Sequence, residues 1–146
     1  MKKLAIIITG CFLVSCTVSK SSFKEELTVQ SFKDRTLQKC LLKGYENKDI
    51  VNRIYDIDKT LYNPVATALF DDEIDDFLIS KINKMKKDSM ESIGKVSEAK
   101  AGKIVFGNCL YVYKSKELDK FATKNINKYK NVKDLDSLIL SKNPSF

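Results

Sequence analysis

Four cysteines and one run of carboxylates are the residues whose types and spacing could do chemistry in this 146-residue chain. The chain has no histidine. A cysteine or serine nucleophile that relies on a histidine base is therefore impossible, as is a zinc site built from histidines. The sequence also has no glycine-rich phosphate-binding loop. The open question is whether each cysteine is a nucleophile, a metal ligand, a lipid attachment site, half of a disulfide or a core residue.

The carboxylates are concentrated in the run DDEIDD, from Asp71 to Asp76. Paired carboxylates could bind a cation or act as acid and base in hydrolysis, but the run lacks the spacing and the glycine of a calcium loop. Acidic residues are favoured in the first turn of a helix because of the helix dipole. We interpret the run as a helix start and expect no metal and no cofactor. A hydrolase that uses these acids is the alternative.

The N-terminal segment MKKLAIIITGCFLVSC has the layout of a lipoprotein signal peptide. Two lysines precede an apolar stretch, Leu4 to Val14, that is shorter than the roughly 20 residues a membrane-spanning helix needs. The residues LVSC, which end at Cys16, resemble the bacterial lipobox, whose cysteine is diacylated and becomes the first mature residue. We expect a signal peptide over 1–15, a lipid on Cys16 and a periplasmic protein anchored to the outer membrane. An ordinary signal peptide or an uncleaved anchor is the alternative.

Cys40 and Cys109 are the thiols that remain once Cys11 leaves with the signal peptide and Cys16 carries lipid. Cys109 has no base to activate it and too few partners to hold a metal. An exported protein can form disulfides, and two cysteines allow one intramolecular pair. We therefore predict a Cys40–Cys109 disulfide, with two reduced core thiols as the alternative. The bond would close a loop of about 70 residues, for which chain-entropy models give about 4 kcal/mol.

Apolar residues recur at helical spacing, which predicts an all-α fold. After a tether over 16–30, the first helix should begin at Ser31, a good N-cap with Asp34 three residues further on. Asn47 should cap the second helix, and Asn63-Pro64 should end or kink it. The expected apolar stripes are Leu37, Cys40, Leu41 and Gly44 on the first helix, and Ile50, Ile54, Ile57 and Leu61 on the second.

The second half of the chain predicts further helices around one irregular segment. Helices should start at Asp71 or Asp72 and at Ser115, while 86–103 has two glycines and few apolar residues and indicates a long loop. Residues 104–113 could be a helix or a buried strand. The spacing of four apolar residues favours a helix, and these are Phe106, Cys109, Leu110 and Tyr113.

We expect a single domain, a helical bundle of four to five helices over 31–130, braced by the disulfide and followed by a C-terminal extension over 131–146.

Two segments, SFKDRTLQKCLLKGY from Ser31 and GNCLYVYKSKELDKF from Gly107, resemble the immunity proteins that neutralise cell-wall amidases of type VI secretion systems. The most similar group protects against papain-like amidases of the fourth effector family. The resemblance implies a small helical exported protein, commonly a homodimer, that is not an enzyme and that occludes the active site of a toxic Cys-His amidase. The lipobox and the segment after Lys130 depart from the family pattern.

In that family a protruding loop between the later helices enters the toxin. By position this loop corresponds to residues 88–102, which lie inside the irregular segment. The resemblance therefore implies that the toxin is contacted by residues of this loop, namely Ser89, Glu91, Ser92, Lys95, Ser97 and Glu98.

The alternative function is that of an envelope lipoprotein that acts as a structural or protein-binding module without a toxin partner. The charge of the chain does not favour nucleic acid as a partner. Loss of Lys2 and Lys3 with the signal peptide lowers the net charge from +7 to +5, and the basic residues are spread along the sequence. An exported protein also has little access to nucleic acid, so none is expected.

Overall fold

The computed structural model describes residues 27–57, 65–97 and 101–142, and all regular secondary structure in these ranges is helical. The predicted all-α fold is therefore confirmed. The signal peptide, Cys16, most of the tether, Asn63-Pro64 and Glu98 lie outside the described residues. The helices are α2 (Val29–Tyr45), α3 (Lys48–Ile57), α4 (Val65–Ala68), α5 (Asp71–Ser92), α6 (Val105–Tyr113), α7 (Lys116–Tyr129) and α8 (Leu135–Lys142).

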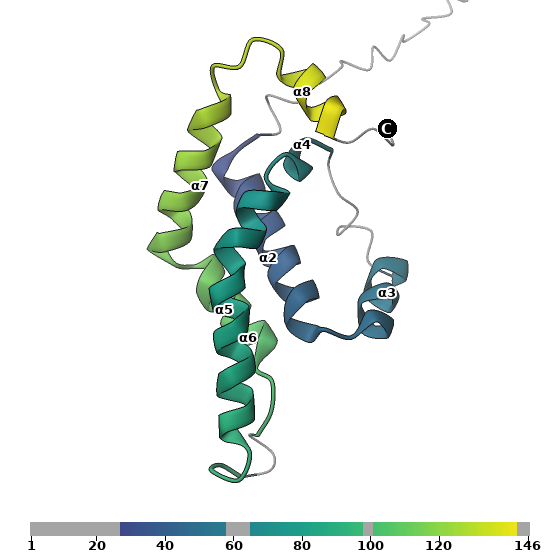
Figure 1. The fold of residues 1–146 in the computed structure, drawn as a ribbon, viewed down its shortest axis with the longest axis vertical. Helices are drawn as coiled ribbons and strands as arrows, with labels where there is room; N and C mark the ends of the chain where they lie inside the picture. Colours follow the sequence, from purple (N-terminus) through teal and green to yellow (C-terminus); the bar gives the residue numbers. More distant parts are fainter. Residues whose placement is uncertain (1–26, 58–64, 98–100, 143–146) are drawn as a thin grey trace, which may run out of the picture.

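The central helix of the bundle is α2, which packs against α5, α6 and α7. Figure 1 shows α7 on one side of α2 and α3 on the other, with the C-terminal end of α5 extending beyond the bundle. Helix α8 packs against α4 and contributes Leu135 and Ile139 to the same core. The segment predicted as a C-terminal extension therefore contains residues of the domain's core.

The N-cap of helix α2 is Thr28, three residues before Ser31, the N-cap that the sequence predicted. The backbone N–H of Ser31 donates to Oγ1 of Thr28 (3.0 Å), and the backbone N–H of Thr28 donates to Oγ of Ser31 (2.9 Å). This reciprocal pair is a capping box in which serine takes the place of the usual glutamate. Val29 and Gln30, predicted to end the tether, are therefore the first residues of α2.

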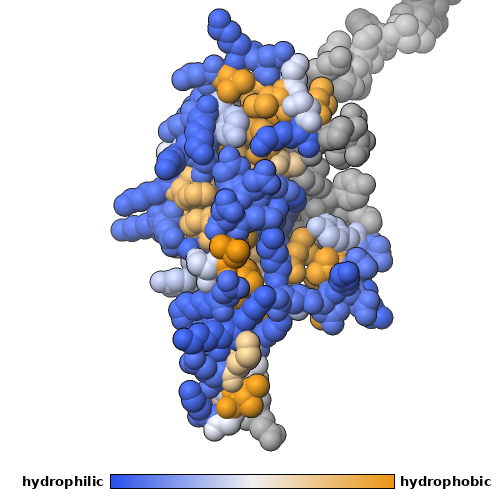
Figure 2. Space-filling view, viewed as in Figure 1, coloured by the Kyte–Doolittle hydropathy of each residue, from blue (hydrophilic) through white to orange (hydrophobic). Residues whose placement is uncertain are grey.

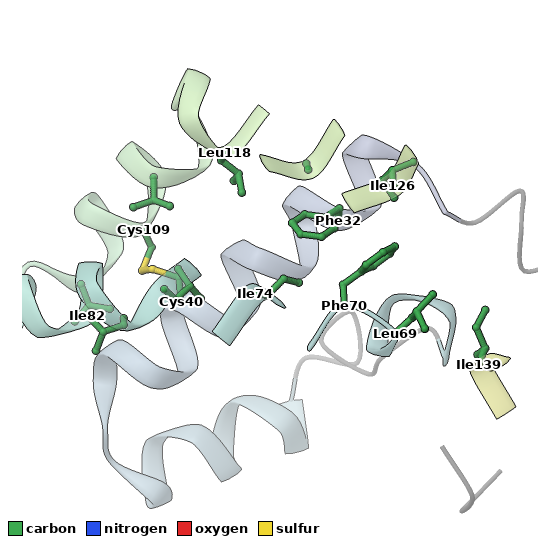
Figure 3. Packing of buried hydrophobic residues seen from close by; sticks show 14 of the residues in the cluster. Phe32, Cys40, Leu69, Phe70, Ile74, Ile82, Cys109, Leu118, Ile126 and Ile139 are labelled. Atoms are coloured by element: carbon green, nitrogen blue, oxygen red, sulfur yellow. A yellow bond between two sulfur atoms is a disulfide. The ribbon is translucent and has the colours of Figure 1, made fainter. Parts of the chain in front are cut away.

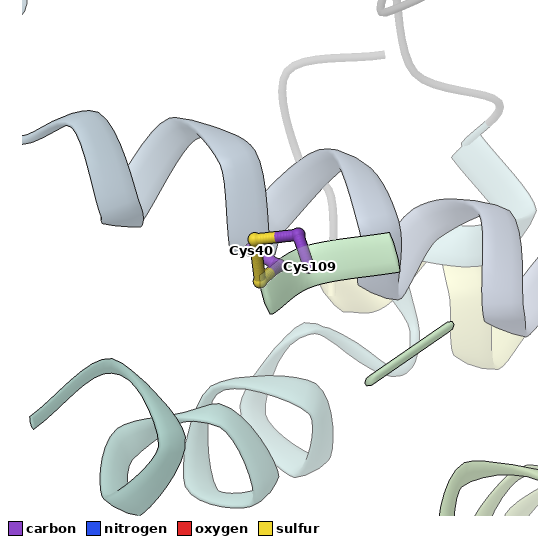
Figure 4. The surroundings of a disulfide bond; sticks show 2 residues. All are labelled: Cys40 and Cys109. Carbon is purple, nitrogen blue, oxygen red and sulfur yellow. A yellow bond between two sulfur atoms is a disulfide. The ribbon is translucent and has the colours of Figure 1, made fainter. Parts of the chain in front are cut away.

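The disulfide between α2 and α6 is confirmed. Cys40 and Cys109 are fully buried and bonded, with their Cα atoms 5.7 Å apart and a sequence separation of 69 (Figure 4). The inward direction of Cys40, which the helical spacing predicted, is also correct. A cysteine held in a buried disulfide offers no thiolate, so in this state Cys109 is neither a nucleophile nor a metal ligand.

Aromatic rings fill the core around the N-terminal half of α2, away from the disulfide (Figure 3). The ring of Phe32 packs against Phe70 and Phe121, with centroids 5.0 and 5.8 Å apart, and Tyr129 packs edge-on against Phe70 at 5.4 Å. Tilted and edge-to-face pairs of this kind stabilise a core beyond the area they bury. One residue, Phe32, thus joins α2 to the start of α5 and to α7.

Ion pairs hold α5 along the flank of α2. Arg35 donates two hydrogen bonds to Asp71, at 2.9 and 2.8 Å. Lys39 bridges Asp71 (3.3 Å) and Asp75 (2.8 Å), and Lys43 also pairs with Asp75 (3.0 Å). The basic residues recur every fourth position on α2 and the acids every fourth position on α5, so the two rows meet in register.

The pKa of Asp75 reflects this arrangement. Partial burial by itself would raise it, but the hydrogen bonds and charges of Lys39 and Lys43 outweigh burial and hold the pKa below its ordinary value. A lowered carboxyl pKa means that the stabilisation is present above the ordinary value and is lost as the pH falls through the lowered one.

The buried faces of two helices differ from the predicted stripes. On α3 no residue is buried, and Ile50 and Ile57 are 42 % and 84 % exposed. On α6 the buried residues are Val105, Cys109 and Val112, whereas Phe106 of the predicted stripe is exposed. Helix α6 is apolar on more than one side, so the tertiary contacts chose which of its faces is buried. Helix α3 has a single apolar face, which the described residues leave partly exposed.

Removal of the disulfide should lower the stability without changing the fold. We expect the Cys40→Ala/Cys109→Ala double variant to lose about 4 kcal/mol of unfolding free energy, because the unfolded chain regains the entropy of a long open loop. Urea denaturation followed by circular dichroism measures the loss. A reductant should destabilise the wild-type protein and leave the double variant unchanged. Free thiols in the non-reduced protein would contradict the pairing.

A second prediction concerns the close approach of α2 and α6 at Gly44. A Cβ atom on Gly44 would lie 2.5 Å from Cγ1 of buried Val105. Gly44→Ala should therefore destabilise the protein by about 1–3 kcal/mol in spite of the better helix propensity of alanine. The matched control is Gly107→Ala in α6, where the added Cβ meets only the exposed side chain of Ile104, at 3.3 Å. That variant should be neutral or stabilised. Equal effects in denaturation would count against the close contact.

Candidate functional site

The C-terminal end of α5 projects beyond the core. The helix has 22 residues, yet its last buried residue is Ile82, ten positions before the end at Ser92. Met85 still packs against the core at its edge, so at about 1.5 Å per residue the last seven positions extend the helix by about 10 Å past its last core contact. Figure 1 shows this end of α5, and the chain that returns from it to α6, below the rest of the bundle. We call residues 88–97 and 101–104 the tip.

The predicted loop over 86–103 is corrected at its start, because α5 continues to Ser92. The pairs Lys84–Asp88 (2.6 Å) and Lys87–Glu91 (3.7 Å), each four residues apart, support the exposed helix here. The scarcity of apolar residues in this segment therefore reflects the exposure of the helix to solvent and not the absence of a helix. The structure places the predicted contact residues Ser89, Glu91 and Ser92 on α5, and Lys95 and Ser97 in the turn that follows.

The tip carries exposed apolar side chains that the sequence argument, which named polar residues, missed. Met90 and Ile93 are 67 % and 69 % exposed, and Val96 is 45 % exposed. Ile104, in the segment that returns to α6, is also exposed. Figure 2 shows apolar atoms at this end of the molecule. Single exposed apolar residues are ordinary, but several on one projecting element indicate a contact surface. The signal in the sequence was the isolated apolar residues within a stretch that otherwise looks like a linker.

Glu46 fastens the base of the tip to α2. It follows the last residue of α2 with φ 52°, in the left-handed region, and accepts from Lys86 of α5 and from Lys103 of the returning chain (2.9 Å). The hydrogen bonds from Lys86 and then Lys103 hold the pKa of Glu46 below its ordinary value. One carboxylate thus ties three separate segments together, and it stays ionised at neutral pH.

A second fastening closes the tip itself. The hydroxyl of Ser92 accepts from the backbone N–H of Gly102 (3.1 Å) and donates to the carbonyl of Ser89 (2.7 Å). Gly94 and Gly102, with φ of 77° and 115°, supply backbone conformations that other residues rarely adopt. Ser92 therefore positions the turn. Together with Glu46 it holds both ends of the tip in place, which lowers the entropy that a partner would have to remove.

The acidic run at the start of α5 serves the fold. Asp71 and Asp75 pair with α2, and Glu73 accepts a hydrogen bond from the hydroxyl of Tyr129 (3.3 Å). Partial burial and the charge of Glu73 raise the pKa of Tyr129. Among the described residues no group of three or more histidine, cysteine or carboxylate side chains could hold a metal ion.

An open groove lies elsewhere, between α2, α3 and α5. Its volume is about 560 Å³, and its walls include Val51 of α3 and Ile79 of α5 beside several charged side chains. None of the predicted contact residues lines it. No helix within the described ranges is long and apolar enough to cross a membrane.

The fastening by Glu46 can be tested through the motion of the tip. In Glu46→Gln the carboxylate charge is lost, so Lys86 and Lys103 lose their common partner and the tip should open more often. We expect faster amide hydrogen exchange at residues 101–104, by about fivefold or more, with little change in the core. The control is Glu91→Gln, which removes an equal charge that pairs only within α5. Equal exchange in the two variants would contradict the role of Glu46.

Comparison with protein-family models, with curated proteins and with solved structures found no match to this chain. The resemblance to the amidase immunity proteins therefore stays a prediction, carried by the two sequence segments alone.

Proposed function

We propose that the protein is a periplasmic immunity protein that inserts its tip into the substrate cleft of a type VI secreted Cys-His peptidoglycan amidase. The observation that carries the proposal is the tip itself: exposed Met90, Ile93 and Val96 on a projecting element whose base is fastened at Glu46 and Ser92. Apolar anchors on a preorganised element supply most of the affinity in many interfaces. The mechanism is steric occlusion, so the chain needs no catalytic group of its own.

The two segments that resemble the immunity family lie in α2 and across α6 and α7. They build the disulfide, the Phe32 cluster and the helices that flank α5. The resemblance thus concerns the scaffold, while the tip lies outside both segments.

The cellular location and the oligomeric state are part of the same proposal. A lipid on Cys16 would keep the inhibitor at the outer membrane, on the side where a delivered amidase acts. A homodimer, as the resemblance implies, would present two tips.

An envelope protein-binding module without a toxin is the second candidate. The groove beside α3, together with the exposed Ile50 and Ile57 on that helix, favours it. The two candidates use different surfaces, and a single pair of variants can separate them.

The test measures whether the protein inhibits a purified type VI secreted Cys-His amidase from the same organism, with peptidoglycan as substrate. Ile93→Asp should weaken inhibition at least tenfold, because a charge would replace an apolar anchor in the cleft. Ile57→Asp, the same substitution at an exposed position of α3, should leave inhibition unchanged. The absence of a complex at micromolar concentrations would reject the immunity function. Loss of partner binding in Ile57→Asp alone would favour the module.

A further inference from the structure

Helix α7 carries a row of lysines on its solvent face. Lys116, Lys120, Lys124 and Lys128 recur every fourth residue, and all four are exposed. The row is about 18 Å long at the helical rise of 1.5 Å per residue. Within the part of the chain that the structure describes, only Lys128 has an acidic group within 4.0 Å, namely Glu73. We call these four residues the lysine row.

The acidic residues of α7 do not neutralise the lysine row, because other helices use them. Glu117 pairs with Lys81 of α5 (2.9 Å), and Asp119 pairs with Lys33 of α2 (2.6 Å). Glu73 and Asp76 of α5 line a hollow beside Lys124 and thus lie at one edge of the row. At the other edge, Lys116 and Lys120 are exposed and form no ion pair within 4.0 Å with a described residue, although Glu117 and Asp119 lie beside them on the same helix.

This arrangement costs helix stability. Like charges four residues apart repel one another, and Lys116 lies in the first turn of α7, where the helix dipole disfavours a cation. A helix selected only for stability would alternate signs along its exposed face, as the pairs on α5 do. We therefore looked for a binding role of the lysine row that would offset this loss of helix stability.

The surroundings of the row limit the kind of partner. None of the exposed large apolar side chains lies on α7, whereas the tip has several. Figure 2 shows hydrophilic side chains projecting from the side of the molecule that α7 forms in Figure 1. The centre of a protein interface is depleted in lysine and rich in apolar groups. A row of flexible point charges suits a broad anionic surface that demands no fixed geometry.

We propose that the lysine row is a docking surface for anionic phospholipid headgroups. A row of this length lies flat on a bilayer, and each lysine near such a surface raises the partition coefficient by about fivefold. Figure 1 places α7 on the opposite side of α2 from α3, and the tip extends along the long axis of the molecule. Docking through α7 therefore leaves both the tip and the groove open to partners. The predicted lipid on Cys16 gives a reason for the domain to lie near a membrane, but the lysine row acts whether or not Cys16 is acylated.

The test is vesicle co-sedimentation of the chain from residue 17 onward, which keeps every residue of the core cluster. Vesicles with about 30 % phosphatidylglycerol should bind it at least tenfold better than pure phosphatidylcholine vesicles, and the binding should fall steeply between about 50 and 300 mM salt. Lys116→Gln/Lys120→Gln should reduce binding at least tenfold. Because both changes relieve repulsion, thermal melting should show this variant to be as stable as the wild type.

The control is Lys84→Gln/Lys87→Gln, which removes the same charge from exposed positions of α5. It should bind within twofold of the wild type. Equal losses in the two variants would show that only net charge matters and would overturn the proposal. Equal binding to both kinds of vesicle would overturn it as well, as would binding to DNA in place of vesicles. The assay contains no amidase, so its outcome is independent of the proposed inhibition.

Discussion

At the centre of the bundle, Cys40 of α2 is bonded to Cys109 of α6, and one turn further along α2 the absence of a side chain at Gly44 lets Val105 approach the helix backbone. These two contacts fix the distance between α2 and α6 and the register in which their residues face each other. The lysine of the returning chain, Lys103, precedes Val105 by two residues, so the same contact sets where Lys103 meets Glu46. The base of the tip thus depends on the packing of α2 against α6.

The tip combines a rigid base with an apolar end. Its base is held by an ion pair of Glu46 and a hydrogen bond to Ser92. These directional contacts position the chain without burying much apolar surface. Its end exposes Met90 and Ile93, whose burial against a partner would be favourable through the hydrophobic effect. A helix that extended without the base would fray and lose affinity through ordering costs. The proposed inhibition therefore depends both on the length of α5 and on the contacts of Glu46 and Ser92.

The charges of the molecule are sorted by the fold. Acids at the start of α5 meet the basic row of α2, and the acids of α7 meet lysines of α2 and α5. After these pairings the lysine row remains on the outside of α7. Lys116, Lys120 and Lys124 therefore lie on successive turns of α7 without an ion pair to a described residue. Other basic residues without such a pair, for example Lys48, Lys95 and Lys133, lie elsewhere on the chain, so the charge is spread over the molecule as it is over the sequence.

The sequence by itself determined the all-α class, most of the helix starts and the Cys40–Cys109 pair. These depend on local spacing, on caps such as Asn47 and Ser115, and on the expectation that Cys11 and Cys16 are not available to pair with Cys40 or Cys109. The tertiary structure decided which side of α6 is buried, that the apolar face of α3 stays partly exposed, how far α5 continues past Ile82, and which lysines form no ion pair among the described residues. Each of these depends on contacts between residues far apart in the sequence. Helical periodicity shows that a face is apolar, but only the arrangement of the other helices shows whether anything covers it.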